Sequence, residues 1–150
     1  MTRITYQIDI ASPPSTVFAF LEDFSNDSKW RANVVEMKPL GEPGDRGGVW
    51  SRQIEVRKVP GRTVETEAVV TAYERDRLLS VRRATGAIRP EATYRLEPAA
   101  GGTRLSFELE IALSGATWLA LPLVWTFATL AIRPVLPKDF ARLKAILERR

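Results

Sequence analysis

The stretch "YRLEPAAGGTRLSFELEI", which runs from Tyr94 to Ile111, decides the fold of this chain. After its turn "AAGG", the apolar Leu105, Phe107 and Leu109 alternate with charged or polar residues, which is typical of a strand with one buried face. Because glycine-rich turn residues join this strand to the one before it, the stretch predicts an antiparallel β-hairpin.

Period-two segments also fill most of the chain before this hairpin. They are separated by turn signals such as "GEPGDRGG" and "PGR", whose glycines and prolines suit connections between strands. Their regular spacing indicates an antiparallel meander preceded by one N-terminal strand. The predicted strands cover residues 2–10, 33–40, 49–59, 63–74, 78–84, 90–98 and 103–113.

Helices are predicted between the first two strands and at the C-terminus. Over residues 12–24, Ser12 is expected to be the N-cap, and Pro13 the first helical residue, where its missing N–H costs nothing. A short helical turn is expected over 25–30. The segment 138–150 has apolar residues at helical spacing and charges opposite them, which predicts an amphipathic helix.

Composition excludes several kinds of chemistry. The 150 residues are expected to form one domain over 1–150, and the N-terminus lacks the apolar region of a signal peptide, which favours a cytoplasmic location. The chain has no cysteine and no histidine, so a thiolate nucleophile, a Ser-His-Asp triad and a histidine-based zinc site are excluded. Catalysis would therefore depend on carboxylates, Tyr, Lys, Arg, hydroxyl groups or substrate positioning.

The positive charge does not indicate a nucleic-acid partner. The net charge is +4, but the 22 basic residues are scattered among 18 acids and never run longer than two. A mixed, solvated surface explains this pattern better, and no nucleic-acid-binding motif is present.

Three segments carry a family resemblance. They are the hairpin quoted above, "ASPPSTVFAFLEDFSNDSKW" (Ala11–Trp30) and "FARLKAILE" (Phe140–Glu148). Together they resemble the polyketide cyclase/dehydrase-like group of the START-related SRPBCC superfamily, over essentially the whole chain. The resemblance implies an α+β helix-grip fold, in which a curved seven-stranded antiparallel sheet surrounds a long C-terminal helix and two short helices follow the first strand.

The resemblance also implies a deep cavity between sheet and helix for an apolar small molecule, but it implies no particular activity. Members include aromatase/cyclases of polyketide pathways, lipid binders and hormone binders. A curved sheet that buries one face against a single helix leaves a concave apolar space, which is where small ligands bind.

Two tryptophans are candidates for the wall of that cavity. Trp30 follows the second short helix and Trp50 begins the third strand, and the resemblance implies that both positions lie near the cavity mouth. Each could contact a flat, ring-bearing ligand, and each could equally belong to the ordinary core.

Three polar residues are the candidate catalytic groups. The resemblance implies that Tyr94 faces inward, where its hydroxyl could donate a hydrogen bond or act as a weak acid, unless it reaches solvent or backbone. Arg52 is expected on an otherwise apolar face with Ile54, where it could bind a carboxylate or polarise a ketone. Arg82 is a similar candidate, although its neighbour Arg83 makes its facing ambiguous. Both arginines could instead be exposed side chains at the sheet edge.

The remaining candidates form the expected ligand-binding wall. Carboxylate pairs such as Glu65 and Glu67 are expected to be solvated, because Ala68 and Val70 occupy the core side of their strand. No metal site and no cofactor site is expected, since the acids are not clustered on a loop. The expected ligand-binding residues are Trp30, Trp50, Ile54, Leu96, Phe107, Trp118, Leu121 and Trp125.

A segment of 22 residues without a charge, from Ile111 to Ile132, needs separate explanation. Its first residues continue a strand and Pro122 interrupts the remainder, which makes it short for a membrane span. We expect a helix that is kinked, or preceded by a loop, at Pro122 and broken again near Pro134. Its apolar residues face several directions, so it requires a second partner: the ligand, another subunit or a membrane surface.

The sequence therefore predicts binding of a hydrophobic or aromatic small molecule in an internal cavity, with polyketide cyclase or dehydrase activity as the enzymatic form of that function. The alternatives are a lipid carrier or membrane-surface protein that uses residues 117–132, and a homodimer in which that segment is the interface.

Overall fold

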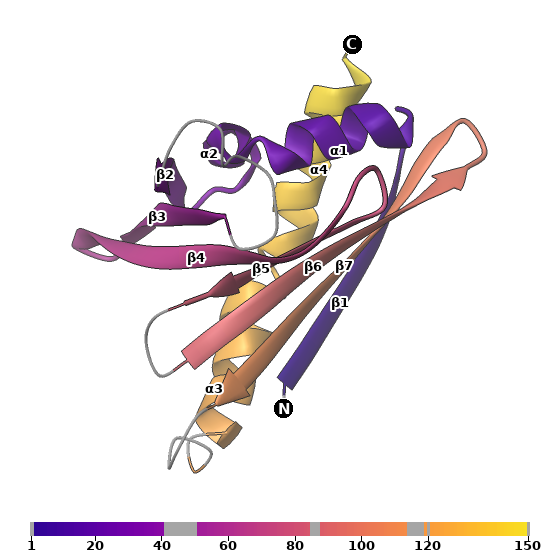
Figure 1. Cartoon of the computed structure of the whole chain (residues 1–150). Coiled ribbons are helices and arrows are strands. Elements are labelled where there is room, and N and C mark those ends of the chain that lie inside the picture. The colour runs from indigo at the N-terminus through magenta and orange to yellow at the C-terminus, as the bar shows by residue number, and fades with distance from the viewer. Residues whose placement is uncertain (1, 41–50, 85–87, 114–118, 120, 150) are drawn as a thin grey trace.

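Seven antiparallel strands form one curved sheet, as predicted (Figure 1). The computed structural model describes residues 2–40, 51–84, 88–113, 119 and 121–149. The strand order is β1-β7-β6-β5-β4-β3-β2, so the N-terminal strand pairs with the last one. The strands are β1 (Thr2–Ile10), β2 (Val34–Leu40), β3 (Arg52–Val59), β4 (Arg62–Glu74), β5 (Leu78–Arg83), β6 (Ile88–Ala99) and β7 (Gly102–Leu113).

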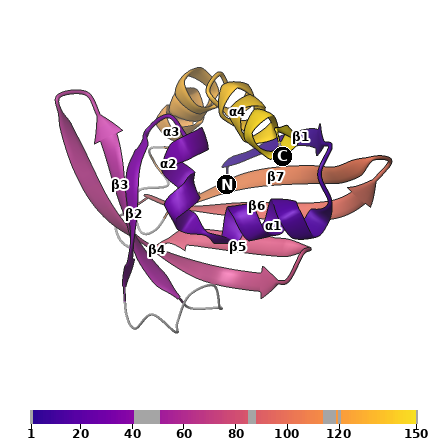
Figure 2. The same cartoon turned by 90° about the horizontal axis from the view of Figure 1, so that it is seen from above.

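The helices lie on the concave side of the sheet, which curves around the C-terminal helix (Figure 2). This arrangement is the helix-grip α+β fold that the sequence predicts. The helices are α1 (Pro14–Glu22), the 3-10 turn η1 (Phe24–Asn26), α2 (Asp27–Trp30), α3 (Leu121–Phe127), the π-helical turn η4 (Ala128–Ile132) and α4 (Leu136–Glu148).

Helix α4 packs its apolar side chains against both the sheet and helix α1. Its Phe140, Leu143 and Leu147 are at most 1% exposed, and they lie in one cluster with Leu105 of β7 and Phe18 of α1. Full burial of such a side chain contributes about 1.5–3 kcal/mol each. The apolar face from which the helix was predicted is therefore the face that packs against the sheet.

The β6–β7 hairpin is anchored to the end of β1. Gly102 has no room for a side chain, because a Cβ atom there would lie 2.0 Å from the carbonyl oxygen of Ile10. Next to it, the Thr103 hydroxyl donates a hydrogen bond of 2.7 Å to the carbonyl of Ser12.

The predicted role of Ser12 as a helix cap is wrong. The N-cap of α1 is Pro13, and the Ser12 hydroxyl instead donates a 2.9 Å hydrogen bond to the Leu147 carbonyl near the end of α4. The tertiary contact replaces the local one, since Ser12 is buried between the hairpin and α4.

The uncharged segment forms two short helical pieces in its described part. Pro122 is the second residue of α3, so it begins this helix and does not kink it. A π-helical turn follows at η4, and the break expected near Pro134 is present as a turn before α4. Within the described ranges, no helix is long and apolar enough to cross a membrane.

Candidate functional site

Five aromatic side chains meet on the concave face of the sheet. Trp30 lies 5.3 Å from Phe140 and 6.4 Å from Tyr94, between ring centroids. Phe107 lies 5.2 Å from both Tyr94 and Phe140, and Tyr6 stacks on Phe140 at 5.2 Å. These separations are those of favourable aromatic pairs. We call these five residues the aromatic cluster.

Three of the candidate site residues are members of the aromatic cluster. Trp30, Tyr94 and Phe107 are buried, as is Leu96 on the same strand as Tyr94. Their rings contact one another or Phe140 of α4, so the aromatic cluster is a continuous group of packed rings in the core.

The other expected wall residues are not gathered there. Ile54 lies on the outer face of β3, opposite Lys38 and Glu67 in the strand register. Trp125 of α3 is exposed. Trp50, Trp118 and the side chain of Leu121 lie outside the described residues.

The inward placement considered for Arg52 and Arg82 is wrong, and the alternative of exposed side chains holds for both. The Arg52 side chain is 64% exposed and forms a 3.0 Å ion pair with Glu67 on the outer face. Arg82 is exposed too, and it lies opposite Glu91 of β6. For Arg52 the reason is that β3 buries its polar residues, Gln53 and Glu55, on the concave side. On β5 it is Arg83, paired with the inward Ala68, that faces the concave side.

Glu55 is the centre of a buried ionic cluster that the sequence analysis missed. Arg31 contacts its carboxylate at 3.2 Å, Arg57 at 2.9 Å and Arg83 at 4.0 Å. Arg31 also forms a 3.0 Å ion pair with Asp27. We call these five residues the arginine cluster.

Strand register and the end of α2 bring the arginine cluster together. Gln53 of β3 pairs with Ala68 of β4, which pairs in turn with Arg83 of β5, so these residues share one face. Glu55 lies on that face two residues further along β3. Arg31 is the C-cap residue of α2 and reaches Glu55 from the helical side.

The two acids of the arginine cluster have pKa values that are shifted in opposite directions. Burial raises the pKa of Asp27 to about 6, although Arg31 opposes this effect. Burial also acts to raise the pKa of Glu55, but the charges of Arg31, Arg57 and Arg83 outweigh it and lower that pKa. Glu55 is therefore charged at neutral pH, while Asp27 can exchange a proton close to neutral pH.

Tyr94 lies close enough to the arginine cluster to share its electrostatics. Burial raises the pKa of its hydroxyl, although the nearby Arg31 opposes that shift. Tyr94 consequently remains protonated at neutral pH and can serve as a hydrogen-bond donor. Tyr94 is a member of the aromatic cluster, because its ring contacts Trp30 and Phe107, and it lies beside the arginine cluster.

Two buried polar atoms beside these clusters have no hydrogen-bond partner among the described residues. They are the indole Nε1 of Trp30, which directly precedes Arg31, and the hydroxyl of Ser51, which directly precedes β3. An unsatisfied buried donor costs about 1–3 kcal/mol. Such atoms are ordinarily satisfied by water or by a ligand.

Comparison with known families identifies the chain. Residues 1–148 match the model of the family described as polyketide cyclase/dehydrase and lipid transport. The chain belongs to this family. Membership supports binding of a hydrophobic small molecule. No curated protein matches the chain.

Solved structures with low sequence identity share the fold of this family member. The Zhui aromatase/cyclase from Streptomyces sp. R1128 has a TM-score of 0.79 at 12% identity, covering 99% of this chain and 94% of that chain. A START superfamily protein from Mycobacterium smegmatis has a TM-score of 0.75 at 13% identity, covering 98% and 97%. The di-domain ARO/CYC BexL from the BE-7585A biosynthetic pathway has a TM-score of 0.75 at 17% identity, covering 99% of this chain and 50% of that chain.

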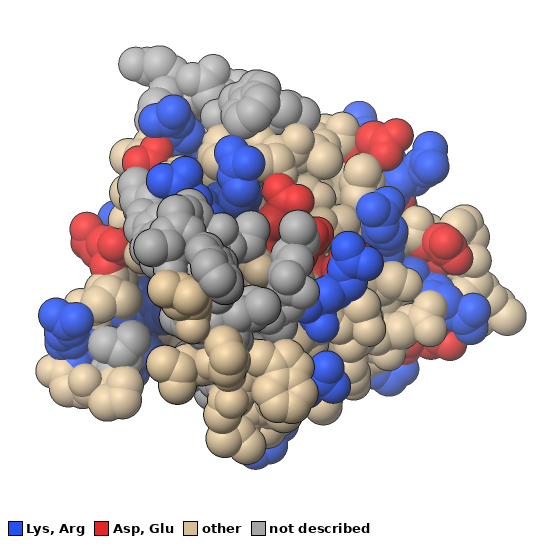
Figure 3. All heavy atoms as spheres, turned by 90° about the horizontal axis from the view of Figure 1, so that it is seen from below, with Lys and Arg blue, Asp and Glu red and all other residues tan. Residues whose placement is uncertain are grey.

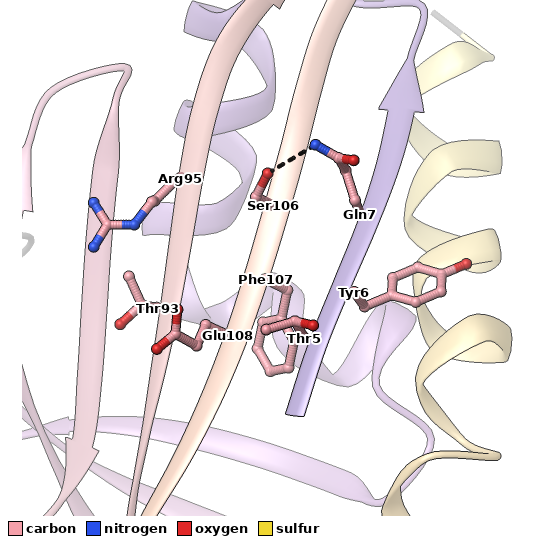
Figure 4. A pocket seen from close by; sticks show the side chains of 8 residues that line it. All are labelled: Thr5, Tyr6, Gln7, Thr93, Arg95, Ser106, Phe107 and Glu108. Carbon is pink, nitrogen blue, oxygen red and sulfur yellow. Dashed lines mark hydrogen bonds between the residues drawn. The ribbon is translucent and has the colours of Figure 1, made fainter. Parts of the chain in front are cut away.

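A hollow of about 440 Å³ lies on the outer face of the sheet. Most of the residues that line it have polar or charged side chains, and the hydrogen bond between Gln7 and Ser106 crosses it (Figure 4). The Tyr6 side chain points away from this hollow toward α4, as Figure 4 also shows. The hollow is therefore distinct from the apolar cavity that the family resemblance implies.

Proposed function

We propose that this protein binds a hydrophobic or aromatic small molecule on the concave face of the sheet, against the aromatic cluster. The observation that carries the proposal is the junction of this cluster with buried charged groups at Tyr94. An apolar surface with a few converging polar groups is typical of small-molecule sites. Family membership supports the same conclusion.

The same groups suit cyclisation or dehydration of a polyketide-like chain. The protonated Tyr94 hydroxyl would donate a hydrogen bond to a substrate carbonyl oxygen and stabilise the negative charge that develops on it. Asp27, with its pKa near 6, would accept the proton lost from the carbon beside that carbonyl. The aromatic cluster would hold the chain in the folded conformation that brings the reacting carbons together.

Binding can be tested with the fluorescent neutral probe N-phenyl-1-naphthylamine. Phe107→Leu removes one ring of the aromatic cluster, and we expect a loss of affinity of about 2- to 12-fold, which corresponds to an aromatic contact of 0.5–1.5 kcal/mol. Phe18→Leu is the matched control, because Phe18 is equally buried but contacts Tyr73 outside the cluster. Absence of probe binding, or an equal loss in both variants, would refute the proposal.

The ligand itself can be identified by native mass spectrometry of the protein purified from its own host. A retained mass that dissociates on denaturation and belongs to an apolar or aromatic compound is the expected result. Turnover is tested by incubating the protein with a poly-β-ketone thioester and comparing the wild type with Tyr94→Phe, which keeps the ring and removes the hydroxyl.

A second function, lipid transfer at a membrane surface, is favoured by the exposed side chains around α3. Leu119, Leu123, Trp125 and Leu130 are 58–75% exposed, an unusual density of large apolar side chains. Figure 3 views the molecule from this end and shows basic side chains interspersed with acidic ones around uncharged ones. We propose that this surface rests on an anionic bilayer.

Flotation with anionic liposomes at low salt tests this second function. Retention of the wild type and its loss in Trp125→Ser is the expected result, with an unchanged melting temperature because Trp125 is exposed. If the wild type does not float, the membrane function fails, and sizing the protein in solution then tests whether this surface joins two subunits.

A further inference from the structure

The arginine cluster holds more positive than negative charge. Three guanidinium groups, from Arg31, Arg57 and Arg83, share the carboxylates of Asp27 and Glu55. Even with both acids ionised, one positive charge of the cluster has no counter-charge among these described side chains. The raised pKa of Asp27 enlarges that excess close to neutral pH.

This excess charge is partly removed from water. The arginine side chains of the cluster are 23–33% exposed and Glu55 is 10% exposed. Taking a charge out of water is costly unless it is paired with an opposite charge and hydrogen-bonded. The nearby Asp139 does not provide that pairing, because it forms a 2.7 Å ion pair with Arg142.

Arg83 is the member with the weakest pairing. Its described contact is the one with Glu55 at 4.0 Å, beyond hydrogen-bond distance, although a guanidinium carries five N–H donors. Burial, together with the like charges of Arg57 and Arg31, lowers the pKa of Arg83. Among the described residues, the guanidinium N–H groups of Arg83 thus have no hydrogen-bond acceptor.

We propose that the arginine cluster binds the carboxylate of a hydrophobic or aromatic carboxylic acid, with Arg83 and Arg57 holding the oxygens and the aromatic cluster holding the body. This inference rests on the proposed function and adds the ligand class. An arginine fork matches a carboxylate bidentately. The excess of one charge fits a monoanion better than a phosphate, which carries nearly two negative charges at neutral pH.

Two probes with the same ring system isolate the contribution of the carboxylate. They are 1-naphthaleneacetic acid and 1-naphthaleneethanol, which differ in carrying a carboxylate or a hydroxyl group. Isothermal titration calorimetry of the full chain should show the acid binding about tenfold more tightly, the effect of one hydrogen bond to a charged group. Arg83→Gln should abolish that preference and leave the alcohol's affinity unchanged.

The neighbouring Arg82→Gln provides the matched control, because Arg82 is exposed on the opposite face of the same strand. It should preserve the preference for the acid. Both variants should keep the wild-type melting temperature within a few degrees, since Arg83 makes no hydrogen bond within the described part of the chain.

The outcomes separate the two proposals. If both probes bind equally and Arg83→Gln changes neither affinity, the carboxylate inference is overturned and small-molecule binding stands. A preference for the acid that Arg82→Gln removes as strongly as Arg83→Gln also overturns it, because the charge would then act from the outer face. If neither probe binds, the proposed function fails together with the inference.

Discussion

Glu55→Gln is the substitution that most directly tests the arginine cluster as a structural element. Removal of one partner from a buried ion pair typically costs about 3–5 kcal/mol. The three guanidinium groups that contact Glu55 are 23–33% exposed, so water can solvate them in the variant and offset part of this cost. We therefore expect a decrease of about 2–3 kcal/mol in the free energy of unfolding. In a chain of 150 residues this corresponds to a melting temperature lowered by roughly 4–12 °C.

The effect should depend on pH in a defined direction. The folded-state pKa of Glu55 lies below its ordinary value of 4.5, because the surrounding arginines outweigh burial. The carboxylate therefore stabilises the fold fully above pH 4.5, and this contribution is lost as the pH falls through the folded-state pKa. The difference in unfolding free energy between wild type and Glu55→Gln should consequently be largest near neutral pH and narrow in acid.

Urea unfolding followed by far-UV circular dichroism measures this difference, with Glu65→Gln as the control. Glu65 is 60% exposed and its contact with Lys38 is 3.5 Å long, so its replacement should change the unfolding free energy by less than about 0.5 kcal/mol. Equal losses in the two variants would refute the reasoning. So would a Glu55→Gln loss that does not decrease in acid.

Two further substitutions test single features of the structure. The raised pKa of Asp27 means that the wild type loses stability as the pH rises from 3.8 through about 6, so Asp27→Asn should gain about 2–3 kcal/mol relative to wild type over that range in pH-dependent urea unfolding. A constant difference between the two proteins would contradict that pKa. Gly102→Ala places a Cβ against the Ile10 carbonyl and should cost about 3 kcal/mol, whereas Gly101→Ala, where φ is +79° and the space is open, should cost about 1. Equal melting temperatures of these two variants would show that the hairpin does not press on β1.

The β6–β7 hairpin and α4 were predictable because each has one apolar and one polar face. In β7 every second residue is apolar, and Leu105 and Phe107 are buried as that alternation requires. Strict alternation leaves one arrangement that buries the apolar set, since a shift by one residue would expose it. The arrangement of strands and of the C-terminal helix follows from such segments, whereas the inward position of Tyr94 was expected from the family resemblance.

Strand β3 could not be placed in the same way, because both of its faces mix charged and apolar residues. Ile54 and Val56 look like the core side by hydrophobicity, yet Gln53 and Glu55 face inward. The burial of Glu55 becomes understandable only with Arg31, which is 24 residues away and approaches from α2. A pairing between distant segments of this kind leaves no periodic pattern in the sequence.

The register could nevertheless have identified Glu55. The inward side of β4 was predicted correctly from Ala68 and Val70, which are buried. Antiparallel pairing transfers a facing from one strand to the next, because residues directly opposite each other point to the same side. Gln53 lies opposite Ala68, so Gln53 must point to the inward side, as Ala68 does. Glu55, two residues further along β3, then points inward as well.

The concave face of the sheet carries two side-by-side groups, the aromatic cluster and the arginine cluster, and their arrangement suggests why the partly buried arginines are retained. The aromatic cluster comes from β1, β6, β7, α2 and α4, whereas the arginine cluster comes from α2, β3 and β5. Replacing the ions by apolar residues would often stabilise such a core. Keeping three arginines there is thus better explained by recognition than by stability, and Tyr94, which lies at the junction of both clusters, is where a bound carboxylate and its apolar body would meet.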